Sequence, residues 1–344
     1  MRSISALLIE QKKPLELAEV EIPQLSYGQV LVEVKQSRIC GSQLGEIDGA
    51  KGPDRWLPHL LGHEGVGIVR EIGPEVSTVR VDDRVCMHWR PGAGINARPP
   101  QYDWNGKTVN AGYVTTFNQY AVVSENRLTT VQSNVSDDLA CLMADTLTTG
   151  FGVVSNDAQV KIGESLCLIG CGGIGMGVIQ GAALAGAYPV IAVDLVDDKL
   201  AFAKRIGATH TFRGDDPDLD SKIRTIVGQA GVDVMVDGTG VPAVIENCYK
   251  LTQPRGRTVL FGVMAYDRSV NLHTLPLHHG QVLTGSEGGQ SRPDIDIPRI
   301  AALHEAGKFS TVEWFTKKGR LSEINDLIAA LRSGQERHVG VRFL

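Results

Sequence analysis

The pattern of hydrophobic and polar positions changes near Gly150. Before this glycine, short runs rich in β-branched residues, such as Val30–Val34 and Gly67–Ile72, are separated by turns of Gly, Pro and Asp. After it, apolar runs such as Ser165–Gly170 alternate with Ala-rich stretches such as Gly177–Ala187 that have helical spacing. The first pattern predicts a barrel-like β domain, and the second predicts βαβ units on a parallel sheet.

The alternating rhythm continues along the chain and then ends. The runs Val232–Asp237 and Thr258–Gly262 each follow a helix-like segment, so six parallel strands fit into the sheet. From about Pro298 the chain returns to helices, and it finishes in Val339–Phe343, a strand-like run. We expect this last run to rejoin the first domain.

Length and composition indicate two folded domains. A chain of 344 residues is too long for one core, and 42% hydrophobic with 21% charged residues is ordinary for globular proteins. We expect an α/β protein whose first domain covers residues 1–150, completed by about 290–344, and whose second domain covers residues 151–289.

Charge and apolar runs exclude several classes of partner. Lys and Arg number 34 against 39 Asp and Glu, and no basic block can neutralise a run of phosphates, so we expect no nucleic acid partner. No apolar stretch reaches the roughly 18–20 residues that span a bilayer, and the N-terminus lacks the long apolar segment of a signal peptide. We expect a cytoplasmic protein without a membrane partner, in which the six cysteines stay reduced.

A glycine-rich turn follows the predicted strand Ser165–Ile169 and precedes a helix. Its spacing is G-x-G-x-x-G, in the strand-turn-helix context of a dinucleotide-binding fingerprint. The first glycine permits a tight turn, the second lets a pyrophosphate approach the backbone, and the third lets the helix lie close to the strand. The alternative is a packed βα turn without a ligand. The predicted cofactor contacts in this turn are Gly170, Gly172, Gly173, Ile174 and Gly175.

An acidic residue ends the next predicted strand. Asp194 lies nineteen residues after Gly175, where a carboxylate would accept hydrogen bonds from the ribose hydroxyls and repel a 2′-phosphate. This position favours NAD over NADP, whereas a helix cap is the alternative role.

A soft thiol and an imidazole are candidates for a metal site. Cys40 lies in Ile39–Gln43 and His63 in Leu61–Gly65, and a thiolate with an imidazole suits zinc. Their separation of 23 residues is not a local finger spacing, and a lone Cys or His is more often a packing residue. Spacing alone therefore leaves both roles open.

The short motifs around these residues resemble those of the zinc-containing medium-chain dehydrogenases, and the resemblance extends over essentially the whole chain. They are C-G-S at Cys40, G-H-E-G at His63, V-x-D-R-V at Val81, the glycine turn and its acid. The resemblance implies a GroES-like β-barrel catalytic domain and a Rossmann domain with a doubly wound parallel sheet. It also implies a hydride transfer between NAD and a small alcohol or, in reverse, a ketone.

The same resemblance implies a catalytic zinc held by Cys40, His63 and Asp145, where many relatives have Cys and some have Asp. Cys141 competes with Asp145 but lies four residues too early, and a buried, small hydrophobic role suits it better. Glu64 is expected to enter the coordination shell transiently, or else to pair with a nearby cation. An open fourth position is what a catalytic zinc requires.

Three departures from the family pattern change the expected site. Gln43 replaces the acid that orients the zinc histidine, and Gly45 replaces a relay histidine, so the proton must leave through a ribose hydroxyl, Glu46 or water. No cysteine lies within residues 90–115, where relatives carry a structural zinc, and Cys86 alone lies nearby, so we expect one zinc per chain. Ser42 matches the hydroxyl that accepts the substrate proton, with a helix cap as its alternative role.

Several further residues match family positions that contact cofactor or substrate. Thr149 and the Gly262–Val263 pair match contacts to nicotinamide, and Lys199 matches a contact to the adenine ribose, although all are also common in turns and on helix surfaces. Trp89 and Arg90 match the substrate pocket, or else belong to the core and the surface. A partly polar pocket favours a polyol, cyclitol, sugar derivative or secondary alcohol.

Two other functions stay open at this point. A zinc-free quinone or enoyl reductase of the same fold would not need Cys40, His63 and Asp145 together, and a non-catalytic binding protein on this scaffold is the other alternative. The resemblance also implies a homodimer or homotetramer formed through the edge of the cofactor domain, near Val259–Val263 and Thr284–Ser286.

Overall fold

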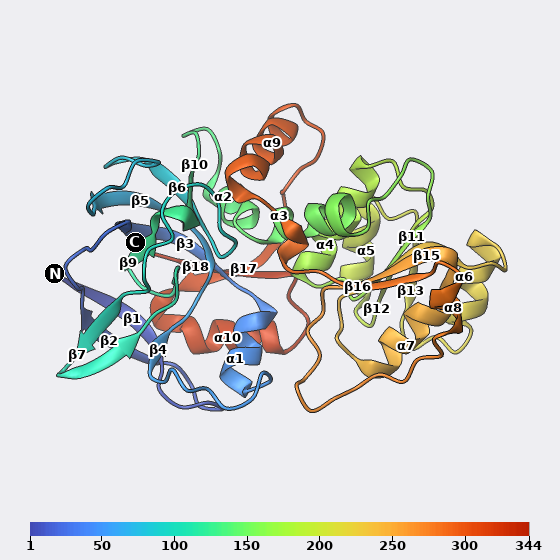
Figure 1. The fold of residues 1–344 in the computed structure, drawn as a ribbon, viewed down its shortest axis with the longest axis horizontal. Helices are drawn as coiled ribbons and strands as arrows, with labels where there is room; N and C mark the ends of the chain where they lie inside the picture. Colours follow the sequence, from blue (N-terminus) through green and yellow to red (C-terminus); the bar gives the residue numbers. More distant parts are fainter. Residues whose placement is uncertain (344) are drawn as a thin grey trace. The chain divides into compact units, whose positions relative to one another are not determined.

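The computed structural model describes residues 1–343, which form two compact units. Unit 1 combines Met1–Asp145 with the chain from Arg292 onward, and unit 2 is the continuous segment Thr146–Ser291. Unit 1 is therefore discontinuous in sequence, as the blue and red parts of Figure 1 show. The assignment of catalysis to one unit and cofactor binding to the other stays a prediction.

Unit 1 contains a small closed barrel. Its strands run in the order β1 (Arg2–Leu8), β2 (Glu16–Glu21), β7 (Gln101–Trp104), β8 (Lys107–Asn110) and β4 (His59–Leu60), which pairs again with β1. Leu7, Val20 and Tyr102 fill its interior. The predicted GroES-like β domain is confirmed.

A larger sheet of unit 1 carries the candidate metal ligands. The strands follow the order β10 (Leu128–Thr130), β6 (Arg84–His88), β5 (Glu64–Ile72), β3 (Gln29–Ile39), β18 (His338–Arg342) and β17 (Phe315–Arg320), and β9 (Tyr120–Ser124) also pairs with β3. Val339 lies opposite Ile39 in the antiparallel β18–β3 pair, so the terminal run does rejoin the first domain.

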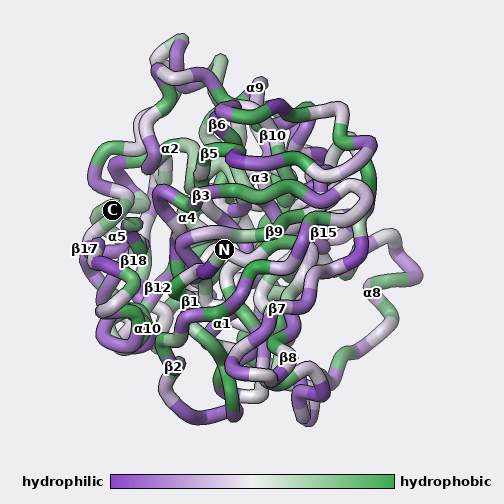
Figure 2. The backbone as a smooth tube through the Cα atoms, turned by 90° about the vertical axis from the view of Figure 1, so that its left-hand side faces the viewer, coloured by the Kyte–Doolittle hydropathy of each residue, from purple (hydrophilic) through white to green (hydrophobic). Residues whose placement is uncertain are grey.

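Strand β3 is buried on both faces because its side chains alternate between two cores. Val30, Val32 and Val34 pack into one hydrophobic cluster, whereas Leu31 packs with the barrel interior. Figure 2 colours the backbone by hydropathy, with β3 and β9 labelled. The helices of unit 1 are α1 (Gly41–Asp48), α2 (Asp137–Met143), α9 (Pro293–Glu305) and α10 (Ile324–Arg332).

Unit 2 is built on one parallel sheet. Its strands lie in the order β13 (His210–Arg213), β12 (Val190–Asp194), β11 (Leu166–Ile169), β14 (Val232–Asp237), β15 (Thr252–Leu260) and β16 (Val282–Gly285). The order reverses between β11 and β14, and ligands bind at such switch points in doubly wound sheets. The Rossmann prediction is confirmed.

Helices cover the sheet of unit 2, and one of them begins earlier than predicted. They are α3 (Thr146–Gly152), α4 (Gly173–Leu184), α5 (Asp197–Arg205), α6 (Leu219–Val227), α7 (Pro242–Leu251) and α8 (Leu275–His278). Helix α4 begins four residues before the predicted start at Gly177, because the glycine turn itself forms the first helical turn. Among residues 1–343, no helix is long and apolar enough to cross a membrane.

Candidate functional site

The end of strand β3 places the first candidate ligand. Cys40 follows β3 directly and is the N-cap residue of α1, with extended backbone angles. Its backbone N–H donates to Oε1 of Gln43 at 2.7 Å, so the first turn of the helix fixes the position of the thiol. Ser42 lies inside this first turn, so the alternative role of Ser42 as the helix cap is wrong.

A glycine positions the second and third candidate ligands. Gly62 has a φ of 91°, and a Cβ there would lie 2.3 Å from the Thr116 hydroxyl oxygen, so the turn before His63 requires glycine. Strand β5 then begins at Glu64, whose carbonyl accepts a 3.0 Å hydrogen bond from the Ser37 hydroxyl. His63 lies in the turn just before the strand and Glu64 is the first strand residue, and their side chains lie in the same region.

The fourth candidate ligand comes from the connection between α2 and α3. Asp145 is buried, and its Oδ1 accepts a 2.8 Å hydrogen bond from Nε1 of Trp89. Its Oδ2 lies 3.5 Å from Nε2 of His63. Trp89 thus fixes one carboxylate oxygen of Asp145 and leaves the other turned toward the histidine.

These side chains form one cluster, called the donor cluster below. One ligand atom from each of Cys40, His63, Glu64 and Asp145 lies within 4.8 Å of all the others. Within residues 1–343, no other group of three or more such side chains gathers in this way. Cys141 is not a member, since its buried thiol faces the Glu64 carbonyl at 3.9 Å and burial raises the pKa of Cys141.

The donor cluster favours a positive charge in its midst. Burial raises the pKa of the Cys40 thiol, but the hydrogen bond with His63 and the charge of Arg38 outweigh burial and lower it to about 6. Burial lowers the pKa of His63, but hydrogen bonds to Asp145 and Cys40 raise it well above its usual value. A thiolate and a carboxylate therefore hold a proton on the imidazole, where a divalent cation would supply the charge instead.

A buried ion pair lies directly against this cluster. Nη1 of Arg38 contacts Oε1 of Glu64, and both side chains are almost completely buried. Burial raises the pKa of Glu64 to about 8 although Arg38 opposes the shift, while burial lowers and Glu64 raises the pKa of Arg38, with a net rise. The raised pKa of Glu64 favours its neutral acid form, whereas the raised pKa of Arg38 favours its charged guanidinium.

Without a cation in the donor cluster, the pKa of the Glu64 carboxyl group is raised. Cys40 and Asp145 place two further negative charges next to the same carboxyl group. A divalent cation among the four ligands would offset these charges and favour the ionised pair with Arg38. Cys40, Asp145 and Glu64 with Arg38 would then balance a divalent ion.

Two polar side chains around the donor cluster serve different purposes. Gln43 is buried, and its Nε2 lies in hydrogen-bond contact with Nδ1 of His63 while its Oε1 holds Cys40. A neutral amide therefore orients the imidazole in place of the expected acid. The Ser42 hydroxyl oxygen is buried and has no hydrogen-bond partner among the described residues, which is unusual for a buried hydroxyl.

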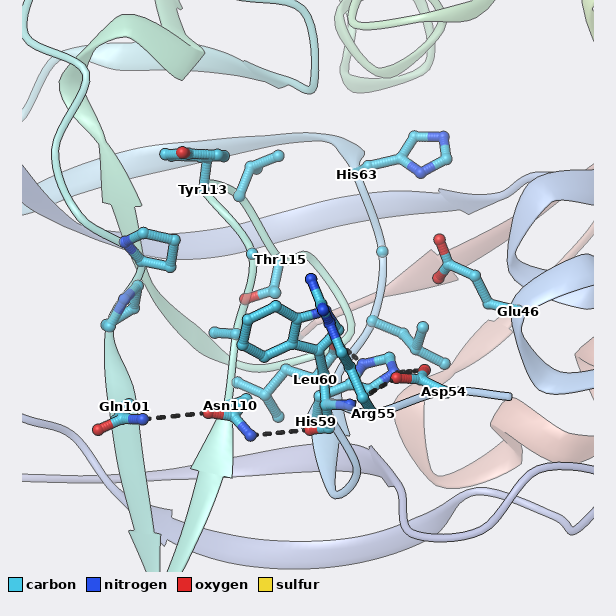
Figure 3. Close-up of a pocket in the computed structure, with 18 of the residues that line it drawn as sticks. Glu46, Asp54, Arg55, His59, Leu60, His63, Gln101, Asn110, Tyr113 and Thr115 are labelled. Carbon is cyan, nitrogen blue, oxygen red and sulfur yellow. Dashed lines mark hydrogen bonds and ion pairs between the residues drawn. The ribbon is translucent and has the colours of Figure 1, made fainter. Parts of the chain in front are cut away.

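A large cavity of about 1170 Å³ opens beside His63 within unit 1. Figure 3 shows His63 and Glu46 at one side of it and Tyr113, Thr115 and Arg55 at other sides. Such a cavity is large enough for a substrate much longer than a simple alcohol.

In unit 2, the glycine turn has the backbone geometry that its spacing predicts. Gly170 has a φ of 100°, and a Cβ at Gly175 would lie 2.2 Å from the Gly170 carbonyl oxygen. A Cβ at Gly172 would meet nothing within 4 Å, so the backbone there is open. Gly173 and Ile174 begin helix α4, whose N-terminal N–H groups are suited to an anion.

Asp194 ends strand β12 beside this turn. Its Oδ2 accepts a 2.7 Å hydrogen bond from the Cys171 N–H, and its Oδ1 accepts one of 2.9 Å from Val196. The carboxylate is thus tied to the glycine turn itself, and the N-cap residue of α5 is Val196 rather than Asp194.

Comparison with known proteins places the chain in a family. The alcohol dehydrogenase GroES-like domain matches residues 26–133, and the zinc-binding dehydrogenase domain matches residues 173–304. The S-(hydroxymethyl)glutathione dehydrogenase of Paracoccus denitrificans is 30% identical over 370 aligned positions, which cover 97% of this chain and 98% of that protein. The chain belongs to the zinc-dependent medium-chain alcohol dehydrogenases.

Solved structures agree with this zinc-dependent alcohol dehydrogenase fold. An alcohol dehydrogenase zinc-binding domain protein from Burkholderia ambifaria superposes with a TM-score of 0.91 at 26% identity, covering 100% of this chain and 99% of that one. Benzyl alcohol dehydrogenase from Acinetobacter calcoaceticus gives 0.89 at 25% identity and covers 100% of both chains.

The remaining predicted residues of this alcohol dehydrogenase lie in varied surroundings. Thr149 is buried in α3, and Lys199 is half-buried on α5. A Cβ at Gly262 would lie 2.5 Å from the Gly240 nitrogen, whereas Val263 is exposed. These contacts with cofactor stay predictions.

The predicted pocket residues lie next to the donor cluster but not along the cavity. Trp89 donates to Asp145, and the Arg90 guanidinium lies 5.6 Å over the Trp89 ring. Neither residue lines the large cavity, and their contact with substrate stays a prediction.

Sequence reasoning missed Arg38 and most of the cavity wall. Arg38 is the one arginine in strand β3, two positions before Cys40, and residues two apart on a strand face the same side. That signal was available in the sequence. The cavity wall comes from several separate segments and offers no comparable local pattern.

Proposed function

We propose that this chain is a zinc-dependent alcohol dehydrogenase that transfers a hydride between an alcohol and NAD, and in reverse reduces a ketone. The observation that carries the proposal is the donor cluster next to the unpartnered Ser42 hydroxyl. The zinc-free quinone or enoyl reductase reading has no use for a buried thiolate, imidazole and carboxylate gathered together. A non-catalytic binding protein has no use for the free hydroxyl.

The donor cluster suits zinc. One thiolate, one imidazole and one carboxylate form a neutral catalytic set with Zn²⁺, and Glu64 is held aside by Arg38 as a transient fourth ligand. A bound Zn²⁺ would act as a Lewis acid that lowers the pKa of an alcohol hydroxyl. We propose one such zinc per chain and no structural zinc.

The protein supplies a path for the proton that the alcohol loses. The Ser42 hydroxyl accepts that proton, since its oxygen is not engaged by the protein. Glu46 lies one helical turn further along α1 and lines the same cavity as His63. A ribose hydroxyl, Glu46 or water then carries the proton outward in place of the histidine that Gly45 replaces.

We propose NAD as the hydride acceptor. The open backbone at Gly172 and the helix start at Gly173–Gly175 leave room for a pyrophosphate. The carboxylate of Asp194 lies beside the turn, where it accepts hydrogen bonds from the ribose hydroxyls and repels a 2′-phosphate. Thr149, Lys199, Gly262 and Val263 complete the proposed contacts.

The proposed substrate is a polyol, cyclitol, sugar derivative or secondary alcohol. The charged and hydroxyl side chains on the cavity wall, such as Lys51, Arg55 and Thr115, support this class over an alkane alcohol. We further propose a cytoplasmic homodimer or homotetramer that uses the edge strand β16.

Metal analysis paired with NAD reduction tests the proposal. Protein purified without chelator is measured by mass spectrometry for zinc, and NAD reduction is followed with polyols, cyclitols and secondary alcohols. One zinc per chain with turnover of any of these alcohols supports the function. Metal-free protein that reduces quinones or enones with a nicotinamide would replace it with the zinc-free reductase.

A further inference from the structure

The cavity beside His63 carries an excess of positive charge that the alcohol chemistry does not use. Lys51, Arg55 and Arg98 line it, and none of the three forms an ion pair with the described residues. The cavity wall holds only two carboxylates, Glu46 and Asp54. All three side chains are exposed along the open cavity wall, and a cleft lined by charges of one sign attracts ligands of the opposite sign.

One of the two carboxylates is already engaged. Asp54 Oδ2 lies 2.8 Å from Nε2 of His59, and its Oδ1 accepts a 2.7 Å hydrogen bond from the Trp56 N–H. Glu46 remains, and it lies toward His63, at the proposed reacting end (Figure 3). The available cations therefore outnumber the available carboxylate, and they lie along the rest of the wall.

The middle of the cavity combines an aromatic face with a guanidinium. The Arg55 guanidinium lies 4.9 Å over the Trp56 ring, a stacking that keeps its outer N–H groups free. Planar guanidinium groups bind carboxylates and phosphates through paired hydrogen bonds. Arg98 offers a second such group on the same cavity wall.

The cavity also holds an unused hydroxyl. Thr115 is 2% exposed and lines the cavity, yet its hydroxyl oxygen has no hydrogen-bond partner among the described residues. Buried hydroxyls are normally satisfied, so an unsatisfied one in a cavity wall indicates a ligand group. A substrate hydroxyl would satisfy it.

We propose that the substrate is a hydroxylated compound with an anionic group, a carboxylate or a phosphate, at the end remote from the reacting alcohol. Arg55 and Arg98 bind the anion, and Thr115 accepts or donates a hydrogen bond to a hydroxyl between the two ends. This inference rests on the proposed alcohol dehydrogenase function and names the substrate class of the same site. The cavity volume of about 1170 Å³ accommodates such an elongated molecule.

Matched probes measure the anion preference. The zinc-loaded protein is assayed with NAD for kcat/KM on ω-hydroxyhexanoate against ω-hydroxyhexanamide, and on sorbitol phosphate against sorbitol. Each pair differs only in the charged end, and the two pairs separate a carboxylate source from a phosphate source. We expect the anionic member to be preferred by at least about tenfold in one pair, because hydrogen bonds to a charged group are roughly twice as strong as those between neutral groups.

Variants locate the preference. Arg55→Gln and Arg98→Gln should each reduce the preference for the anionic member by about tenfold, and raised salt should weaken the preference in the wild type. Thr115→Val should lower kcat/KM about threefold to tenfold for sorbitol phosphate but not for ω-hydroxyhexanoate, which lacks a central hydroxyl. Lys317→Gln is the control, since Lys317 is exposed on β17 and outside the cavity.

Two outcomes contradict the inference. Equal kcat/KM for both members of each pair, or an anion preference that survives both arginine variants, shows that these guanidinium groups do not read the substrate. Turnover of sorbitol or the amide in either case leaves the alcohol dehydrogenase function standing. If no probe is oxidised, calorimetric binding of the anionic and neutral members still measures the preference, while the absent turnover counts against the proposed function alone.

Discussion

The donor cluster of unit 1 and the glycine turn of unit 2 are built differently. The first consists of side chains, and the second consists mainly of backbone. The cluster brings side chains from three separate segments into a buried space, where their charges shift each other's pKa values. The turn uses the backbone of one short run, Gly170–Gly175, and a single carboxylate, Asp194. A side-chain site depends on charge balance, whereas a backbone site depends on chain geometry.

Removing a ligand should break unit 1 chemistry and leave unit 2 intact. Cys40→Ala or Asp145→Ala should abolish zinc retention and lower turnover at least about a thousandfold, because the proposed zinc is catalytic rather than a folding core. Metal analysis, kinetics and circular dichroism measure this. Cys141→Ala is the matched control and should keep its zinc, since Cys141 lies outside the donor cluster.

Retained zinc and turnover in both Cys40→Ala and Asp145→Ala would contradict the metal site. NAD binding, measured by fluorescence titration, should be little changed in these variants. A loss of NAD binding equal to the loss of zinc would show that the two sites are not independent.

Removing the buried cation tests the charge balance of the cluster. Arg38→Gln leaves Glu64 without its ion-pair partner, and breaking a buried pair costs about 3–5 kcal/mol. We expect a lower melting temperature and faster loss of zinc to a chelator. Arg70→Gln breaks an exposed pair with Glu33 in the same sheet and should cost about 1 kcal/mol or less; equal effects of the two variants would contradict a special role for Arg38.

Acid should lower the free energy of unfolding of unit 1 because His88 is buried there. Burial lowers the pKa of His88 to about 4 from its usual value near 6.5. Below pH 6.5 the unfolded chain therefore binds a proton that the folded chain refuses until about pH 4, so the free energy of unfolding falls by up to about 3 kcal/mol as the pH drops through this window.

The variant His88→Asn isolates this contribution. Its side-chain amide can still donate to the Arg90 carbonyl, which His88 contacts through Nδ1 at 2.8 Å, but it does not titrate. Urea unfolding at several pH values should show a shallower acid slope in the variant than in the wild type. Identical slopes would show that folding does not lower the pKa of His88.

The smallest effect is expected for the backbone site. Changing Asp194 to Gly together with Leu195→Arg should shift the ratio of kcat/KM from NAD toward NADP by about tenfold or more, since the repelling carboxylate is replaced by a cation. Leu195→Arg alone is the control. An unchanged preference in the double variant would mean that the ribose binds elsewhere, and zinc content should be the same in all three proteins.

The comparison also explains what the sequence could predict. The alternation of strands and helices and the run Gly170–Gly175 are local patterns, so the parallel sheet of βαβ units and the shape of the turn followed from spacing alone. Cys40 and His63 are 23 residues apart, and resemblance to a family was needed to pair them with Asp145. No spacing rule connects such residues before the chain is folded.

The parts that were missed depend on tertiary contacts. Arg38 pairs with Glu64 across two strands, and Trp89 donates to Asp145 from a third strand end. Gln43 was expected only to stand in place of the acid that orients the histidine, yet its amide contacts both Cys40 and His63. Each of these roles is defined by which segments meet, which a single sequence does not state.

The pairing of β18 with β3 affects the order in which parts of the protein can fold during synthesis. The ribosome makes β3 and Cys40 early, then the whole of unit 2, and only afterwards β18, one of the three strands that pair with β3. Unit 2 is continuous and can fold as soon as it emerges. The sheet that supports the donor cluster is completed last, so a nascent chain that stalls after unit 2 holds a finished Rossmann fold and an unfinished donor cluster.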